Sequence, residues 1–125
     1  MLKLEVVEVR DEPLQRGTPD EVREREGRRI APHLAGCHAI ALDVTGRARS
    51  SEQLAELLRD LEERPPQRTA FVIGGACGLA PAVLATAAER LSLGPLTLPH
   101  QLARVVLGEQ LYRATTILRG EPYHR

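Results

Sequence analysis

The sequence predicts an α/β fold with a mostly parallel sheet, and three observations support this prediction. Two short, almost continuously apolar runs, His38–Val44 and Thr69–Gly75, are typical of strands that are covered on both faces. Segments with helical periodicity or a helix-start signal lie between and after these runs. The length of 125 residues fits a single domain, residues 1–125, built around one sheet.

The first third of the chain combines a strand pattern with a charged helix. Residues 2–9 alternate apolar and polar side chains, as a strand with one buried face does. Thr18 and Glu21 have the spacing of a capping box, so we expect a helix that reaches about Leu34. Its apolar stripe is thin and Gly27 weakens it. We therefore expect this helix to lie on the surface.

Three further helices are predicted. Ser50 and Gln53 form a capping box ahead of an amphipathic helix. The leucines that recur at helical spacing in it are Leu54, Leu57, Leu58 and Leu61. Pro81 is expected to open a helix that runs to about Arg90. Residues 101–118 form the last helix, which is apolar nearly all round. Such a helix must be covered on more than one side, so we expect a partner subunit.

Composition and charge exclude several classes of protein. The chain has 17 basic and 17 acidic residues, so no net field draws it to nucleic acid. Its only aromatic residues are Phe71, Tyr112 and Tyr123, which disfavours an RNA-binding sheet that stacks bases on aromatic rings. The two cysteines show no zinc-site spacing, so we expect no metal. The chain lacks a membrane span and a signal-peptide pattern, which predicts a cytoplasmic protein without a membrane partner.

Three short loops at strand ends are candidates for one binding site. The first begins at Leu42 in the stretch LDVTG, the second is the glycine turn IGGACG, and the third is GPLTLP. Glycine allows close backbone approach, and open α/β sheets bind ligands at the carboxyl ends of their strands. The glycine turn alone fits a tight turn without a ligand equally well. Cys77 within it has no neighbouring feature that would activate a nucleophile.

The motifs LDVTG, SSEQLA, FVIGGACGL, LSLGPLTLPHQLARVVLGEQLYRA and the terminal PYHR occur in one order. In this order they resemble the ribosomal RNA large subunit methyltransferase H family of the SPOUT superfamily. The resemblance is close over residues 38–125 and looser over residues 3–34. It implies an S-adenosylmethionine-dependent homodimer that methylates N3 of a pseudouridine in bacterial large-subunit ribosomal RNA, on an assembled ribosomal particle. It also implies helices on both faces of the sheet and a C-terminal trefoil knot, an exception to the usual absence of threaded loops.

The resemblance also assigns roles to particular residues. The implied cofactor contacts are Leu42, Gly75, Gly94, Pro95, Leu96, Thr97, Leu98 and Pro99. The implied substrate-binding residues are His100, Arg104, Glu109 and Tyr112. The implied catalytic residues are Arg113, Tyr123, His124 and Arg125. Read without the resemblance, His100 is a helix-start residue, and Glu109 with Arg113 is an ordinary helix pair. The sequence does not choose which group removes the N3 proton.

Departures from the family pattern keep two alternatives open. The glycine turn reads GGACG where the family usually has GGPEG, and Ala80 stands where a capping serine is usual. The chain also begins at what resembles the family's second strand. One alternative is therefore a non-catalytic dimeric binding module that has lost activity with its N-terminal elements. The other is an unrelated α/β hydrolase or redox protein that uses Cys77.

Overall fold

The computed structural model describes residues 12–13, 15–63 and 68–124, so the strand predicted for residues 2–9 lies outside the described residues. The capping boxes predicted at Thr18 and Ser50 are both complete. Strands and helices alternate along the described chain, which confirms the predicted α/β class. The elements are α1 (Pro19–Leu34), β1 (Cys37–Ala48), α2 (Ser51–Glu62), β2 (Arg68–Val72), α3 (Pro81–Thr86), β3 (Glu89–Ser92) and α4 (His100–Arg119).

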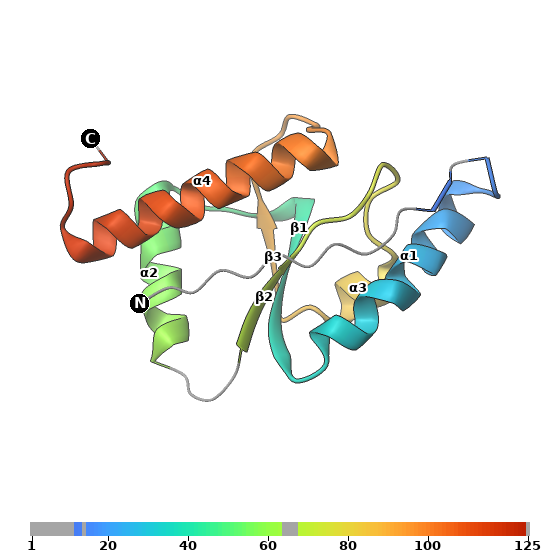
Figure 1. Ribbon diagram of the computed structural model, residues 1–125, viewed down its shortest axis with the longest axis horizontal. Helices are drawn as coiled ribbons and strands as arrows, with labels where there is room; N and C mark the ends of the chain where they lie inside the picture. The colour runs from blue at the N-terminus through green and yellow to red at the C-terminus, as the bar shows by residue number, and fades with distance from the viewer. Residues whose placement is uncertain (1–11, 14, 64–67, 125) are drawn as a thin grey trace.

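The sheet has β1 at its centre, between β2 and β3, and both pairings are parallel. Ala41 of β1 pairs with Val72 of β2, and Leu42 of β1 pairs with Leu91 of β3. Figure 1 shows α2 and α4 on one side of the sheet and α1 with α3 on the other. This arrangement gives the predicted helices on both faces.

Two hydrophobic cores follow from the alternation of side chains along β1. Ile40 points to the core under α2 and α4, whereas Ala39 and Ala41 point to the core under α1 and α3. On the second side, a Cβ atom at Gly27 would lie 3.2 Å from the side chains of both Ala80 and Val83. Gly27 therefore allows α1 to pack tightly on α3, although glycine lowers the helix propensity of α1.

The helix predicted from Pro81 to Arg90 is wrong in its second half. α3 ends at Thr86, and β3 follows at Glu89–Ser92. The N–H of Ala88 donates to the carbonyl oxygen of Ala39 at 2.9 Å, so pairing with β1 replaces the helical hydrogen bonds. Residues 89–92 form only a four-residue strand with charged residues at its start, and no sequence pattern marks it.

Strand ends also differ from the prediction. β1 extends to Ala48, beyond the predicted end at Val44, after a register shift in which Leu42 and Arg47 both pair with Leu91. β2 ends at Val72, before the glycines that were predicted to belong to it. Among the described residues, no helix is long and apolar enough to cross a membrane.

Candidate functional site

The three candidate segments lie at the same end of the sheet, but the first, LDVTG, is not the predicted loop, because it is part of β1, which runs to Ala48. Leu42 is at the last pairing of β1 before its register shift, Gly75 follows the end of β2, and Gly94 follows the end of β3. Neighbouring strands are about 4.8 Å apart, so loops that leave adjacent parallel strands at one edge are neighbours. The structure thus brings together the three segments that the sequence analysis grouped.

The loop after β3 is held by a side chain that sequence reasoning missed. The hydroxyl of Ser92, which is 7% exposed, accepts from the N–H of Gly94 and donates to its carbonyl oxygen, both at 3.1 Å. Gly94 has φ of +121°, a conformation that favours glycine. A serine two residues before a glycine is a recognisable turn signal. Leu96, further along this loop, is 77% exposed.

The glycine turn after β2 is closed by its own backbone. The N–H of Gly78 donates to the carbonyl oxygen of Gly75 at 3.0 Å, and Gly78 has φ of +82°. A Cβ atom at Gly74 would lie 2.5 Å from the carbonyl carbon of Gly78. A Cβ atom at Gly75 would lie 2.9 Å from Oε2 and 3.0 Å from Oε1 of Glu26. Backbone packing therefore requires glycine at position 74, whereas a side chain at position 75 would force the Glu26 carboxylate to move.

Helix α1 supports this turn through two charged side chains. Nη1 of Arg23 donates to the carbonyl oxygen of Cys77 at 3.0 Å. Glu26 is 6% exposed, and its Oε2 accepts from the N–H of Glu12 at 3.1 Å. Oε1 of Glu26 has no hydrogen-bond partner among the described residues. The sequence carries no signal for this role, since a charged helix is typical of a solvent-facing element.

The C-terminal residues fold back onto α4. Gly120 has φ of +70° and ends the helix with a left-handed residue. Oη of Tyr123 then donates to Oε2 of Glu109 at 3.1 Å, and Nε2 of His124 lies 2.6 Å from Oε1 of Glu52. Nη1 of Arg113 lies 3.2 Å from Nδ1 of His124. We call Glu52, Glu109, Arg113, Tyr123 and His124 the tail cluster.

Further contacts tie the tail cluster together. Arg113 donates to Oε2 of Glu109 from Nε at 3.1 Å and from Nη2 at 2.9 Å. The same guanidinium lies 4.8 Å from the ring centroid of Tyr123, a cation–π contact. Tyr112 packs edge-on against Tyr123 with ring centroids 4.9 Å apart. Glu109, Tyr112 and Arg113 thus contact Tyr123, and His124 contacts Arg113. The structure gathers these predicted site residues around Tyr123.

Hydrogen bonds set the protonation states in the cluster. The hydrogen bond from Arg113, helped by that from Tyr123, lowers the pKa of Glu109 below its ordinary value. The hydrogen bond to Glu109 raises the pKa of Tyr123, so the phenol stays neutral. The hydrogen bond with His124 lowers the pKa of Glu52. Both carboxylates therefore remain ionised at neutral pH.

The predicted site residues fall into two groups at different places along α4. His100 is the first residue of the helix, next to the third loop, and Arg104 lies one turn later. At a rise of about 1.5 Å per residue, His100 and Arg113 are about 20 Å apart along the helix. Figure 1 shows the C-terminal tail at the end of α4 opposite to the strand-end loops. Arg125 lies outside the described residues.

One side of α4 is apolar and uncovered in the single chain. Leu107, Leu111 and Ala114 are buried against α2 and the sheet. Val105 is 65% exposed and Leu102 is 47% exposed, and Tyr112 is also exposed. α4 therefore carries apolar side chains on an exposed side as well as on its buried side.

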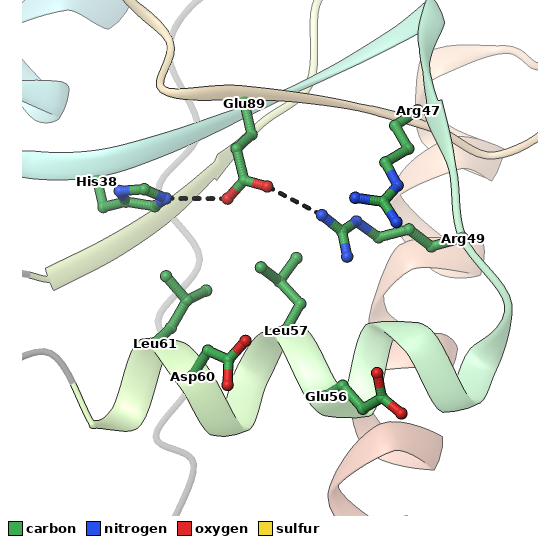
Figure 2. A pocket seen from close by; sticks show the side chains of 8 residues that line it. All are labelled: His38, Arg47, Arg49, Glu56, Leu57, Asp60, Leu61 and Glu89. Atoms are coloured by element: carbon green, nitrogen blue, oxygen red, sulfur yellow. Dashed lines mark hydrogen bonds and ion pairs between the residues drawn. The ribbon is translucent and has the colours of Figure 1, made fainter.

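A separate cavity of about 380 Å³ lies between α2 and the β1–β3 side of the sheet (Figure 2). Glu89 accepts there from Arg49 at 3.0 Å and lies 3.1 Å from Nε2 of His38. Glu56 and Asp60 of α2 line the opposite wall. Three carboxylates, two arginines and one histidine line this cavity, and no predicted site residue lines it. Within the described residues, no group of three His, Cys, Asp or Glu side chains is placed to hold a metal.

Comparisons with known proteins agree on one family. A family model described as "Predicted SPOUT methyltransferase" matches residues 1–124. A ribosomal RNA large subunit methyltransferase H from Gemmatimonas aurantiaca is 50% identical over 123 residues, which cover 98% of this chain and 79% of that protein. The enzyme of the same name from Listeria monocytogenes is 46% identical over 128 residues, covering 98% and 80% of the two chains. The chain belongs to the SPOUT methyltransferase family.

Proposed function

We propose that this protein is an S-adenosylmethionine-dependent methyltransferase that methylates N3 of a pseudouridine in bacterial large-subunit ribosomal RNA. The coarse activity is supported by the names of its relatives, which are ribosomal RNA large subunit methyltransferases. The main structural support for the proposal is that the chain has two groups of candidate site residues. One is three adjacent segments at the strand ends, and the other is the tail cluster of ionised and aromatic side chains. A ribosomal substrate implies a cytoplasmic reaction.

The strand-end loops fit a ligand with the polar edges of a nucleoside. Leu42, Gly75 and residues 94–99 lie at the edge where parallel sheets bind ligands. Oε1 of Glu26, which is buried behind Gly75 and has no partner among the described residues, is an acceptor for a donor group of such a ligand. When bound there, S-adenosylmethionine supplies a methyl group that is already activated on sulfur.

The tail cluster supplies the groups for the substrate side. Glu109 stays ionised and holds both Arg113 and Tyr123 in place. The guanidinium of Arg113 is suited to stabilise the negative charge that develops on the base as the N3 proton leaves. Tyr123 presents a neutral ring and hydroxyl for orientation of the base. His100 and Arg104, beside the third loop, are suited to contact RNA next to the reacting nucleotide.

A homodimer would unite the two groups. The loops and the tail cluster are at different places along α4, so one chain does not bring them together. The exposed apolar side of α4, with Leu102, Val105 and Tyr112, is suited to pack against the same side of a second copy. With antiparallel α4 helices, the tail cluster of one copy would meet the loops of the other. The proposed fold includes a C-terminal trefoil knot through these loops, within a single domain.

Two measurements test the proposal. Titration calorimetry with S-adenosylmethionine should give binding with one site per chain. Methyl groups from labelled S-adenosylmethionine should then be incorporated into large ribosomal subunits from cells that lack this modification, and into a single pseudouridine. Absence of binding would refute the methyltransferase. Binding without incorporation would favour the non-catalytic module. A Cys77→Ser variant should retain activity, and its inactivation would revive the cysteine-based alternative.

A further inference from the structure

The imidazole of His124 has a partner on each of its nitrogens. Nη1 of Arg113 lies 3.2 Å from Nδ1, and Oε1 of Glu52 lies 2.6 Å from Nε2. An arginine guanidinium is only a donor, so Nδ1 must accept with its lone pair. An ionised carboxylate is only an acceptor, so Nε2 must carry the proton. The two neighbours therefore select one tautomer and one orientation of the ring.

The position of Glu52 suits it to hold the C-terminal tail. It lies in the first turn of α2, next to Ser51, whose hydroxyl donates to Oε1 of Gln110 on α4 at 2.6 Å. The start of α2 is thus tied to α4 independently of the tail. His124, by contrast, follows the left-handed Gly120 and is held by side-chain contacts to Arg113 and Glu52. Its side chain is 26% exposed, and that of Glu52 is 61% exposed.

We propose that Glu52 is a positioning residue that docks the C-terminal tail by fixing His124, and through it Arg113 and Tyr123, in the geometry needed for methyl transfer. This inference rests on the proposed function for its effect on activity, but the docking itself does not depend on it. With Nδ1 accepting from Arg113 and Nε2–H donating to Glu52, His124 links the tail to α2. Neither of its nitrogens is free to take the N3 proton in this arrangement.

The docking is tested on the free protein by nuclear magnetic resonance. In the wild-type protein the amides of residues 121–124 should have heteronuclear Overhauser effects like those of α4, and the Nε2 proton of His124 should be protected from exchange. In Glu52→Ala both signatures should be lost. Glu52→Gln keeps an acceptor oxygen and should retain part of them. The control is Glu56→Ala, one turn further along α2 in the cavity of Figure 2, which should behave as wild type.

Methyl transfer gives the second readout. Glu52→Ala should lower kcat about tenfold, because misplaced groups lose orientation, and leave the Kd for S-adenosylmethionine unchanged. Glu52→Gln should recover part of the loss. An ordered tail in Glu52→Ala would overturn the docking, and a disordered tail with unchanged kcat would overturn the positioning role. If the wild-type protein transferred no methyl group, the proposed function would fail, while the resonance measurement would still decide the docking.

Discussion

Replacing Gly75 by alanine tests whether the glycine turn is shaped by helix α1. The new Cβ atom would lie 2.9 Å and 3.0 Å from the two carboxylate oxygens of Glu26, which is closer than ordinary contact. The carboxylate is the far end of a side chain and must move by a few tenths of an ångström, which strains its 3.1 Å hydrogen bond with the N–H of Glu12. Overpacking costs about 1–3 kcal/mol, and the lower half of this range applies because a side chain rather than backbone gives way. We expect the free energy of unfolding to fall by about 1–2 kcal/mol.

Urea unfolding followed by circular dichroism, at one protein concentration, measures this change. Gly74→Ala is the comparison, since its Cβ atom would lie 2.5 Å from the backbone of Gly78, which cannot swing away. Gly74→Ala should lower the free energy of unfolding by more than Gly75→Ala does. In the double variant Gly75→Ala with Glu26→Ala the clash is absent. Its loss in the free energy of unfolding should therefore be smaller than the sum of the two single losses by about 1 kcal/mol or more. Additive effects, or an undiminished stability of Gly75→Ala, would refute the reasoning.

Four further predictions concern the core, the exposed side of α4, the cap of α2 and the tail. Leu107→Ala removes a buried side chain between α4 and the sheet and should cost about 2–5 kcal/mol in urea unfolding. Leu102→Ala, at an exposed site, should leave chain stability nearly unchanged but raise the dissociation constant of the proposed dimer in sedimentation. Ser50→Ala removes the N-cap of α2 and should lower the free energy of unfolding by about 1 kcal/mol. An unchanged midpoint of urea unfolding would contradict a stabilising role of this cap. The folded pKa of Glu109 is depressed below its ordinary 4.5, so its contribution to tail docking is complete above pH 4.5 and lost as pH falls through the folded value. Amide shifts of the tail followed down the pH scale should report this loss, and Glu109→Gln should leave only the part of the transition that comes from Glu52, whose pKa is also lowered.

The sequence predicted the elements whose signals are local. Capping boxes at Thr18 and Ser50 depend on residues three positions apart, and both helices start as predicted. The apolar run in β1 likewise predicted a strand buried on both faces. The strand Glu89–Ser92 was not predicted because it is short and partly charged, and because it forms only by pairing with β1 about 50 residues earlier. Propensity alone favoured a continued helix there.

The candidate site was predictable in part. Leu42 and the glycine turn could be grouped because each lies at the end of a predicted strand, and strand ends meet at one edge of a parallel sheet. The third segment, GPLTLP, was grouped with them although the strand that precedes it, β3, was predicted as part of a helix. The supporting residues could not be found this way. Glu52 is 72 positions from His124, and Glu26 reaches Gly75 from a helix that was expected to lie on the surface. Such contacts are fixed by tertiary packing, which leaves no periodic trace in the sequence.

The claim on which the account depends most is that a tail cluster from one copy completes the loops of another. Two variants, each inactive alone, test it: Leu96→Arg, at an exposed loop residue that the fold should tolerate, and Arg113→Ala in the tail cluster. Mixed dimers of the two contain one intact loop set facing one intact tail. After subunit exchange of equal amounts, methyl transfer should recover to about one quarter of the wild-type rate. A mixture that stays as inactive as its parents, although mass spectrometry shows mixed dimers, would contradict the shared site.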